Sequence, residues 1–181
     1  MALKALGIGR GDEVITQSFN FIATVEAIVD TGANVVFTDI DDTLNMCPKN
    51  LESLISKKTK AIIPVHMLGV PADMILINRI GKRNKIPVVE DACEAIGAKV
   101  AGQYVGGLSE FGVFSFDFGK MITTGEGGAL FSKKKSDGKN ARMYHDHGHK
   151  NIPSLPRGLD HAGPVSYTHL TLPTTGIGEG E

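Results

Sequence analysis

Residues 113–130 read VFSFDFGKMITTGEGGAL and contain the clearest strand–loop–strand pattern in the chain. The stretch opens with an apolar, aromatic run at residues 113–116, which is typical of a buried strand. A loop rich in threonine and glycine follows, and it carries a single lysine, Lys120. Residues 125–128 then lead into a second apolar run at 129–131. The pattern predicts two core strands joined by a tight loop that holds one lysine.

Lys120 is the first candidate for chemistry. A lysine on a tight loop between two core strands has little contact with water, and desolvation favours a neutral amine over an ammonium ion. A neutral amine can attack an aldehyde, which is how enzymes attach pyridoxal 5'-phosphate (PLP). The alternative is an ordinary exposed loop lysine, and the local sequence leaves that alternative open.

The 181 residues carry a formal net charge of -1, with 41% hydrophobic and 22% charged residues. These values indicate a soluble, globular domain with a proper core. The near-neutral charge gives no reason to expect nucleic acid or an anionic membrane as a partner. No apolar run is long enough to span a bilayer, and the N-terminus lacks a signal-peptide pattern. Cys47 and Cys93 define neither a disulfide framework nor a metal spacing, so we expect reduced thiols in a cytoplasmic protein.

Strand and helix patterns alternate along the rest of the chain. After a helix end at residues 2–6, we expect strands at 12–16, 34–40, 60–66 and 87–91, and helices at 18–30, 48–56, 71–84 and 133–144. Ser18 is the predicted N-cap of the first full helix, and the last, polar helix is expected to leave the sheet. Continuously apolar strands between helices are typical of a mostly parallel sheet with helices on both faces. The predicted fold class is therefore α/β.

In such sheets, ligands bind beyond the carboxyl ends of the strands. Phe21, His66, Asp91 and Ser115 all lie at or just after the expected strand ends. We therefore expect these side chains to converge on one edge of the sheet.

Several blocks of the sequence resemble one protein family. Residues 115–128, with Ser-Phe-x-x-x-Lys followed by Thr-Thr-Gly-Glu-Gly-Gly, closely resemble the active-site segment of the DegT/StrS family, the PLP-dependent aminotransferases of nucleotide-sugar metabolism. QSFNFIAT (residues 17–24) and EDACEAIGA (residues 90–98) resemble two further blocks of that family. The resemblance implies a partial large domain of the fold type I PLP-dependent aminotransferases, with the cofactor carried by Lys120.

The resemblance also implies roles for four other residues. Asp91 would pair with the pyridinium nitrogen of PLP and keep it protonated, while its spacing alone leaves a helix N-cap as the alternative. Glu94 stands where the family commonly has Gln, near the 3-oxygen of the ring. Phe21 would pack on the ring face, with a core aromatic as the alternative. Ser115 would bond the cofactor phosphate, with a strand-edge hydroxyl as the alternative.

His66 lies in a Pro-Val-His block that resembles the family, and it could orient a substrate or be satisfied by the backbone; we favour the structural role. The alternating histidines His145, His147 and His149 and the acidic turn at residues 39–42 could suggest a metal. We expect none, because metal sites need supporting ligands from elsewhere and the resemblance gives both stretches counterparts without a metal. The glycines at 125–128 could cradle a phosphate, but no Walker lysine-serine pattern follows them.

The resemblance extends over residues 1–160, which we expect to form part of a PLP-binding large domain. The family's upstream Gly-Thr loop, whose amides hold the phosphate, does not precede residue 2, and PVSYTHLTLPTT stands where the family continues with Gly-x-Asn-Tyr-Arg. We therefore expect an interior fragment of a longer gene, with residues 161–181 as a non-family tail that is disordered or artefactual.

For the full-length parent, the resemblance implies a cytoplasmic, homodimeric aminotransferase that moves an amino group from an amino acid, with glutamate favoured, to a keto-sugar nucleotide. Lys120 would release PLP to the donor and then move a proton as general base. The alternatives are a catalytically inactive fragment, a PLP-dependent sugar dehydratase of the same family, in which histidine replaces the lysine, and a nucleotide-binding dehydrogenase, whose glycine fingerprint is missing. The sequence does not name the sugar, the nucleotide or the position aminated.

Overall fold

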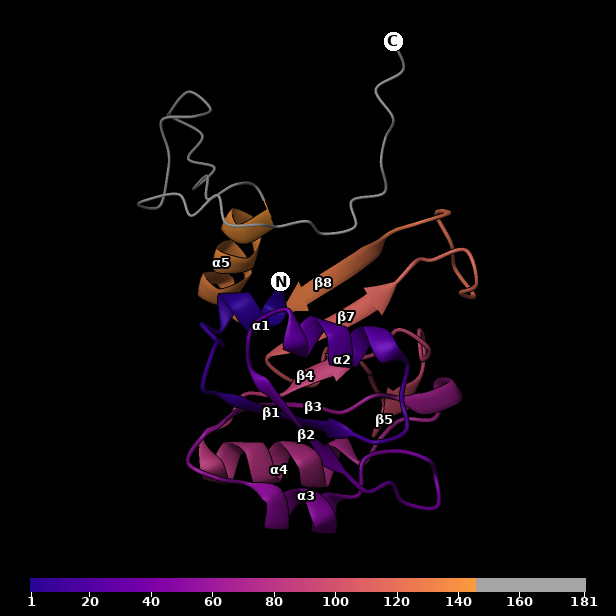
Figure 1. The fold of residues 1–181 in the computed structure, drawn as a ribbon. Coiled ribbons are helices and arrows are strands. Elements are labelled where there is room, and N and C mark those ends of the chain that lie inside the picture. The colour runs from indigo at the N-terminus through magenta and orange to yellow at the C-terminus, as the bar shows by residue number, and fades with distance from the viewer. Residues whose placement is uncertain (146–181) are drawn as a thin grey trace, which may run out of the picture.

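The apolar strand patterns build one mixed sheet through the middle of the structure (Figure 1). The computed structural model describes residues 1–145. The strands of the sheet are β1 (Glu13–Gln17), β2 (Asn34–Thr38), β3 (Thr59–Ile63), β4 (Val89–Asp91), β7 (Phe111–Ser115) and β8 (Gly128–Ser132). Two ladders, β2–β1–β3 and β4–β7–β8, are joined by parallel bridges from Ile62 to Val88 and from Val65 to Asp91. The strands run parallel except β8, which returns antiparallel to β7.

Both faces of the central strands are buried. Successive residues of a strand point to opposite faces, so Val14 packs in one hydrophobic cluster and its neighbour Ile15 in the other. Ile63 and Ile62 divide between the two clusters in the same way. Because neither face meets water there, consecutive residues in the middle of these strands are apolar, which is why the sequence predicts a sheet between two helix layers.

Helices cover the two faces (Figure 1). The layer around Val14 holds α1 (Ala2–Ala5), α2 (Ile22–Val29) and α5 (Lys135–His145), and the layer around Ile15 holds α3 (Pro48–Leu54) and α4 (Met74–Asn84). A 3-10 helix, η1 (Met67–Gly69), follows β3, and a hairpin of β5 (Lys99–Val100) and β6 (Gln103–Tyr104) precedes β7. None of the helices within residues 1–145 is long and apolar enough to cross a lipid bilayer.

Two helices begin later than the sequence predicts. α2 starts at Ile22 with Phe21 at its N-cap, so Ser18 does not cap it. α4 starts at Met74, because the Asp73 side chain accepts a hydrogen bond from the backbone N–H of Leu76 and caps the helix there.

Two other expectations need correction. The polar helix near the end of the described chain does not leave the sheet, because α5 packs on α1 and β8 and buries Ala141. The segment that follows Asp91, the turn segment (residues 92–98), contains no helix.

The sequence pattern also does not reveal the β5–β6 hairpin, whose strands of two residues are too short to show a period.

Gly112 in β7 has no room for a side chain. A Cβ built on it would overlap the carbonyl group of Gly106 in the preceding loop. We therefore expect Gly112→Ala to lower the free energy of unfolding by about 1–3 kcal/mol, the usual cost of overpacking, in urea titrations followed by circular dichroism. Gly107→Ala is the matched control, since a Cβ there meets the Tyr104 carbonyl oxygen at 3.6 Å, an ordinary contact. Equal stabilities of the two variants would contradict this close packing.

Candidate active site

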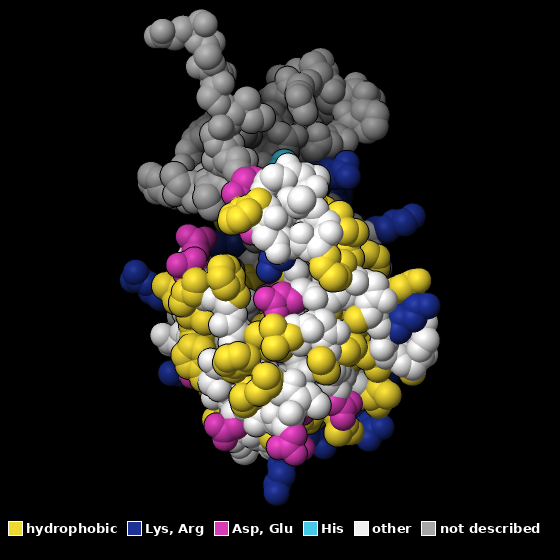
Figure 2. All heavy atoms as spheres, turned by 90° about the vertical axis from the view of Figure 1, so that its right-hand side faces the viewer, with side chains coloured by type: hydrophobic (Ala, Val, Ile, Leu, Met, Phe, Trp, Pro, Cys, Tyr) yellow, Lys and Arg dark blue, Asp and Glu magenta, His cyan; other side chains and the backbone are white. Residues whose placement is uncertain are grey.

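The segments that follow the parallel strands meet at one edge of the sheet, on the right-hand side of Figure 1. They include residues 18–21 after β1, η1 after β3, the turn segment after β4 and the lysine loop (residues 116–127) after β7. Figure 2 looks onto this edge and shows hydrophobic side chains gathered there. The exposed large apolar residues on or beside these segments are Phe19, Phe21, Ile22, Leu68, Val70, Phe118, Met121 and Ile122.

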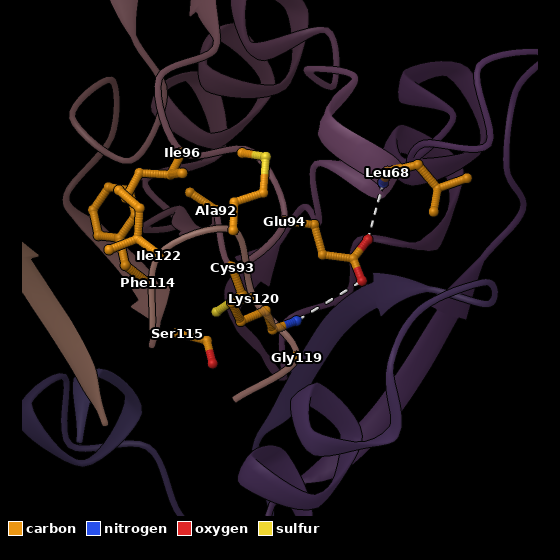
Figure 3. Close-up of a pocket in the computed structure, with 11 residues that line it drawn as sticks. Leu68, Ala92, Cys93, Glu94, Ile96, Phe114, Ser115, Gly119, Lys120 and Ile122 are labelled. Atoms are coloured by element: carbon orange, nitrogen blue, oxygen red, sulfur yellow. Dashed lines mark hydrogen bonds and ion pairs between the residues drawn. The ribbon is translucent and has the colours of Figure 1, made fainter. Parts of the chain in front are cut away.

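A cavity of about 220 Å³ opens between the turn segment and the lysine loop (Figure 3). Ile96, Phe114 and Ile122 gather on one side of it, and Glu94 and Lys120 lie on the other. The cavity therefore offers an apolar wall opposite a pair of charged groups.

Lys120 lies beside two of the other predicted site residues. Its Nζ is 3.9 Å from Oε1 of Glu94 and 5.8 Å from the centre of the Phe21 ring. The second oxygen of Glu94 accepts a hydrogen bond of 2.9 Å from the backbone N–H of Leu68 in η1 (Figure 3). The Lys120 and Glu94 side chains are 22% and 29% exposed, so Lys120 is not the fully exposed loop lysine that the sequence left open. A partly exposed ion pair contributes about 1 kcal/mol or less, so this contact orients the amine more than it stabilises the fold.

Phe21 presents its ring at this edge instead of burying it. The residue is the N-cap of α2 and its side chain is 66% exposed. The alternative of a core aromatic is therefore wrong. An exposed aromatic face next to an amine is available for stacking on a flat ligand.

Asp91 is the last residue of β4, and both of its carboxylate oxygens accept hydrogen bonds. Oδ2 accepts one of 2.6 Å from the Thr24 hydroxyl, and Oδ1 accepts one of 3.2 Å from the backbone N–H of Cys93. No helix begins here, so the N-cap alternative for Asp91 is wrong. Burial raises the pKa of the neighbouring Cys93 thiol, and the charge of Asp91 and a hydrogen bond to it raise that pKa further.

The Cys93 thiol can report on the charge of Asp91. Asp91→Asn removes that charge while burial remains, so the thiol pKa should fall part of the way and the thiolate fraction should rise. We expect iodoacetamide to alkylate Cys93 at least about threefold faster at pH 8 in Asp91→Asn than in the parent chain. A Cys47→Ser background leaves Cys93 as the one thiol, and peptide mass spectrometry measures the rate. An unchanged rate would show that the Asp91 charge does not reach the thiol.

Ser115 is the last residue of β7 and lines the cavity. Its oxygen accepts a hydrogen bond of 3.3 Å from the backbone N–H of Asp117. Within residues 1–145 the hydroxyl has no acceptor for its own proton, so it can donate one to an anionic group in the cavity.

His66 is fully buried, and both ring nitrogens are engaged. Nδ1 accepts a hydrogen bond of 3.0 Å from the backbone N–H of Ala72, so the ring proton resides on Nε2, which lies 3.3 Å from Oε2 of Glu90. His66 has no nitrogen left for a substrate, in agreement with the structural role that the sequence favoured.

Glu90 and Thr24 are the residues that sequence reasoning missed. Glu90 is fully buried, and its carboxylate accepts hydrogen bonds of 2.7 Å from the backbone N–H groups of Gly106, Leu108 and Ser109. The available signal was a charged residue inside the apolar strand PVVED, since buried carboxylates need partners. Thr24 gave no such signal, because its partner lies 67 positions away in the chain.

Replacing Glu90 should be costly even when the shape is kept. In Glu90→Gln an NH2 group takes the place of one oxygen, so at least one backbone N–H loses its acceptor and faces another donor. We expect the free energy of unfolding to fall by about 1–3 kcal/mol, measured in urea. The control, Glu52→Gln, alters an exposed pair with Arg83 and should change it by less than about 0.5 kcal/mol. Similar losses of stability in both variants would contradict the conclusion that the backbone N–H groups need the buried Glu90 carboxylate as their acceptor.

The structure tests the expectation that no metal is bound only for residues 1–145. His145 ends α5, whereas His147, His149 and the predicted tail at 161–181 lie outside the described residues. Within residues 1–145, no three His, Cys, Asp or Glu side chains are grouped so that they could hold a metal ion.

Solved structures define the class of this fold. The aminotransferase from Psychrobacter cryohalolentis superposes with a TM-score of 0.80 at 38% identity, over 82% of this chain and 38% of that one. NtdA from Bacillus subtilis, solved with its cofactor PMP bound, gives a TM-score of 0.77 at 33% identity, over 84% of this chain and 35% of that one. The described domain is therefore part of the large domain of the fold type I aminotransferases, and the predicted fold class is confirmed.

Sequence relatives narrow the class to one family. The family model of the DegT/DnrJ/EryC1/StrS aminotransferases matches residues 1–160. The chain is 44% identical over 152 residues to a pleiotropic regulatory protein of Geobacillus stearothermophilus, and 43% identical over 150 residues to a UDP-N-acetyl-3-dehydro-alpha-D-glucosamine 3-aminotransferase of Acidithiobacillus ferrooxidans. These alignments cover 83% and 82% of the chain but 41% of each relative, so the chain spans about two fifths of their length. The chain belongs to the DegT/DnrJ/EryC1/StrS aminotransferase family, which confirms the resemblance seen in its motifs.

Proposed function

We propose that this chain is the cofactor-binding part of a PLP-dependent aminotransferase that moves an amino group from an amino acid to a keto-sugar nucleotide. The observation that carries the proposal is the Lys120 amine, which lies beside the Glu94 carboxylate and the Phe21 ring at a cavity on the carboxyl edge of the sheet. Bound PLP supplies an aldehyde that reacts with amines and a ring that withdraws electrons from the reacting carbon.

The groups at this edge match the parts of PLP. The Ser115 hydroxyl has a proton to donate to a phosphate, and the Asp91 carboxylate can accept one from a protonated ring nitrogen. The exposed face of Phe21 suits an aromatic ring, and Lys120 is the amine that suits an aldehyde. Glu94, held by the Leu68 amide, completes the set beside Lys120.

Each residue then has a defined task in transamination. Lys120 Nζ takes the proton from the α carbon of the amino donor and later returns a proton on the acceptor side. Asp91 holds the proton on the ring nitrogen, and Phe21 keeps water from one face of the ring. Glu94 Oε1, 3.9 Å from the Lys120 amine, attracts it when it is charged and so keeps Nζ at the cavity.

The proposed substrates follow from the family and from one relative. The Acidithiobacillus relative is named for an aminotransferase reaction on a UDP-linked 3-dehydro sugar, which supports a keto-sugar nucleotide as acceptor and leaves its sugar and nucleotide open. Glutamate is the proposed donor. The presence of Lys120 favours transamination over the dehydratase alternative, in which histidine takes that position.

We also propose that the whole enzyme is a cytoplasmic homodimer. The support for a partner is the set of large apolar side chains that stay exposed at the carboxyl edge, including Phe118 at 79% and Met121 at 78%.

Labelling with PLP tests the role of Lys120. The chain is mixed with PLP, the adduct is reduced with borohydride, and the labelled peptide is identified by mass spectrometry. We expect the label on the Lys120 peptide of the parent chain and its loss in Lys120→Ala, because that variant lacks the attacking amine. Lys133→Ala is the matched control, since it removes an exposed lysine at the end of β8 and should keep the label.

Glutamate tests the reaction itself. Added to the PLP-treated chain before reduction, glutamate should release 2-oxoglutarate and lower the label on the Lys120 peptide in the unmutated chain and in the Lys133→Ala control. Lys120→Ala, which has no label on that peptide, should release no 2-oxoglutarate. Label spread equally over surface lysines, or equal label in all three proteins, would overturn the assignment of Lys120. Specific label without any 2-oxoglutarate would favour the alternative of a catalytically inactive piece.

A further inference from the structure

The first turn of α2 brings two side chains toward the site. Phe21 at its N-cap and Thr24 are three residues apart, which places them on the same side of the helix. They differ in environment, because Phe21 is 66% exposed whereas Thr24 is 7% exposed. Phe21 can therefore meet a ligand directly, and Thr24 can act only through a neighbouring protein group.

That neighbouring group is the Asp91 carboxylate. The Thr24 hydroxyl donates to Oδ2 of Asp91 at 2.6 Å, a short bond of the kind formed when the acceptor is ionised. A threonine within a helix commonly bonds the backbone carbonyl three or four positions earlier. Here the hydroxyl instead reaches from α2 to the end of β4, so the bond links two elements at the carboxyl edge.

The bond fixes the direction of the carboxylate. Oδ1 of Asp91 is already held by the Cys93 amide at 3.2 Å, and the Thr24 hydroxyl holds Oδ2, so rotation of the carboxylate about its last bond is blocked. An ionised carboxylate has about four acceptor positions, and these two bonds leave others free for a ligand. Water cannot take over the task of the hydroxyl easily, because Thr24 is nearly inaccessible to solvent.

We propose that Thr24 is a positioning residue, whose hydroxyl fixes the Asp91 carboxylate in the direction from which it receives the ring nitrogen of the cofactor. This inference rests on the proposed function for the ligand, but the link from Thr24 to Asp91 stands on the contacts themselves. Because Phe21 and Thr24 share one turn of α2, the helix sets the placement of the stacking ring and of the carboxylate together.

The test compares three variants. Thr24→Val keeps the shape and loses the hydroxyl, while Thr24→Ser keeps the hydroxyl. Thr31→Val is the matched control, since the Thr31 hydroxyl is similarly buried, at 8% exposed, and donates at 2.7 Å to the Ile28 carbonyl oxygen, a bond at the other end of α2. A merely structural role for Thr24 predicts that both valine variants lose stability and nothing else.

The first readout needs no cofactor. The alkylation rate of Cys93, in the Cys47→Ser background, follows the charge of Asp91 near the thiol. If Thr24 holds the carboxylate, Thr24→Val should release it, change its distance from the thiol and so change the rate at least about twofold from that of the unmutated chain. Thr24→Ser and Thr31→Val should keep the parent rate. An unchanged rate in Thr24→Val would overturn the inference, whether or not PLP binds.

The second readout is the affinity for PLP, measured from reducible label on Lys120 against PLP concentration. We expect Thr24→Val to bind PLP about tenfold more weakly or worse, as for the loss of a bond to a charged group, and Thr24→Ser to stay within about twofold of the parent. Parent-like affinity in Thr24→Val would overturn the cofactor part of the inference. If the parent chain itself takes no label on Lys120, the proposed function fails, and the Cys93 rates still decide whether Thr24 positions Asp91.

Discussion

The buried Glu90 carboxylate is the constraint on which the carboxyl edge of the sheet depends. A buried charge that loses its partners destabilises a protein by several kcal/mol, so the groups around it must be in place whenever the chain is folded. Its oxygens gather the Gly106, Leu108 and Ser109 amides and face the His66 ring. β4, the end of β3 and the loop before β7 are thereby locked together. Asp91 is the next residue along β4, so its backbone position is fixed by the same carboxylate.

Other buried polar side chains tie this edge in the same way. Gln17 at the end of β1 donates to the Phe19 and Leu44 carbonyl oxygens and accepts from the Met46 and Val65 amides. Asn45 donates to the Val70 carbonyl oxygen and accepts from the Met67 amide, which fastens η1. The interior of the sheet is held by apolar packing, whereas its carboxyl edge is held by side-chain bonds between strand ends. Site residues whose positions are fixed by such hydrogen bonds keep their geometry without a ligand.

The difference between those two kinds of bonding explains what the sequence could predict. Apolar runs such as residues 61–63 record burial on both faces, so the layers, the parallel strands and the convergence of Asp91 and Ser115 on one edge could be predicted. Family motifs then singled out Lys120. The hydrogen bonds of Glu90 and Thr24 could not be predicted. Each joins two residues that are separated by at least 16 and at most 67 positions in the chain, and such contacts leave no local period in the sequence. The start of α2 was missed for a related reason: Asn20 bonds back to the Gln17 carbonyl oxygen, and this keeps the preceding segment out of the helix.

The raised pKa of Cys93 has a consequence for the selectivity of the cavity toward electrophiles. Cys93 and Lys120 line the same cavity, so it contains two potential nucleophiles. A thiolate is the stronger of the two toward most electrophiles, but burial and the charge of Asp91 keep the Cys93 thiol protonated. An aldehyde that enters the cavity therefore meets an amine without competition from sulfur. The Asp91 carboxylate, which we propose pairs with the ring nitrogen, thus also lowers the reactivity of the Cys93 thiol. A cysteine can therefore line this cavity without reacting in place of Lys120.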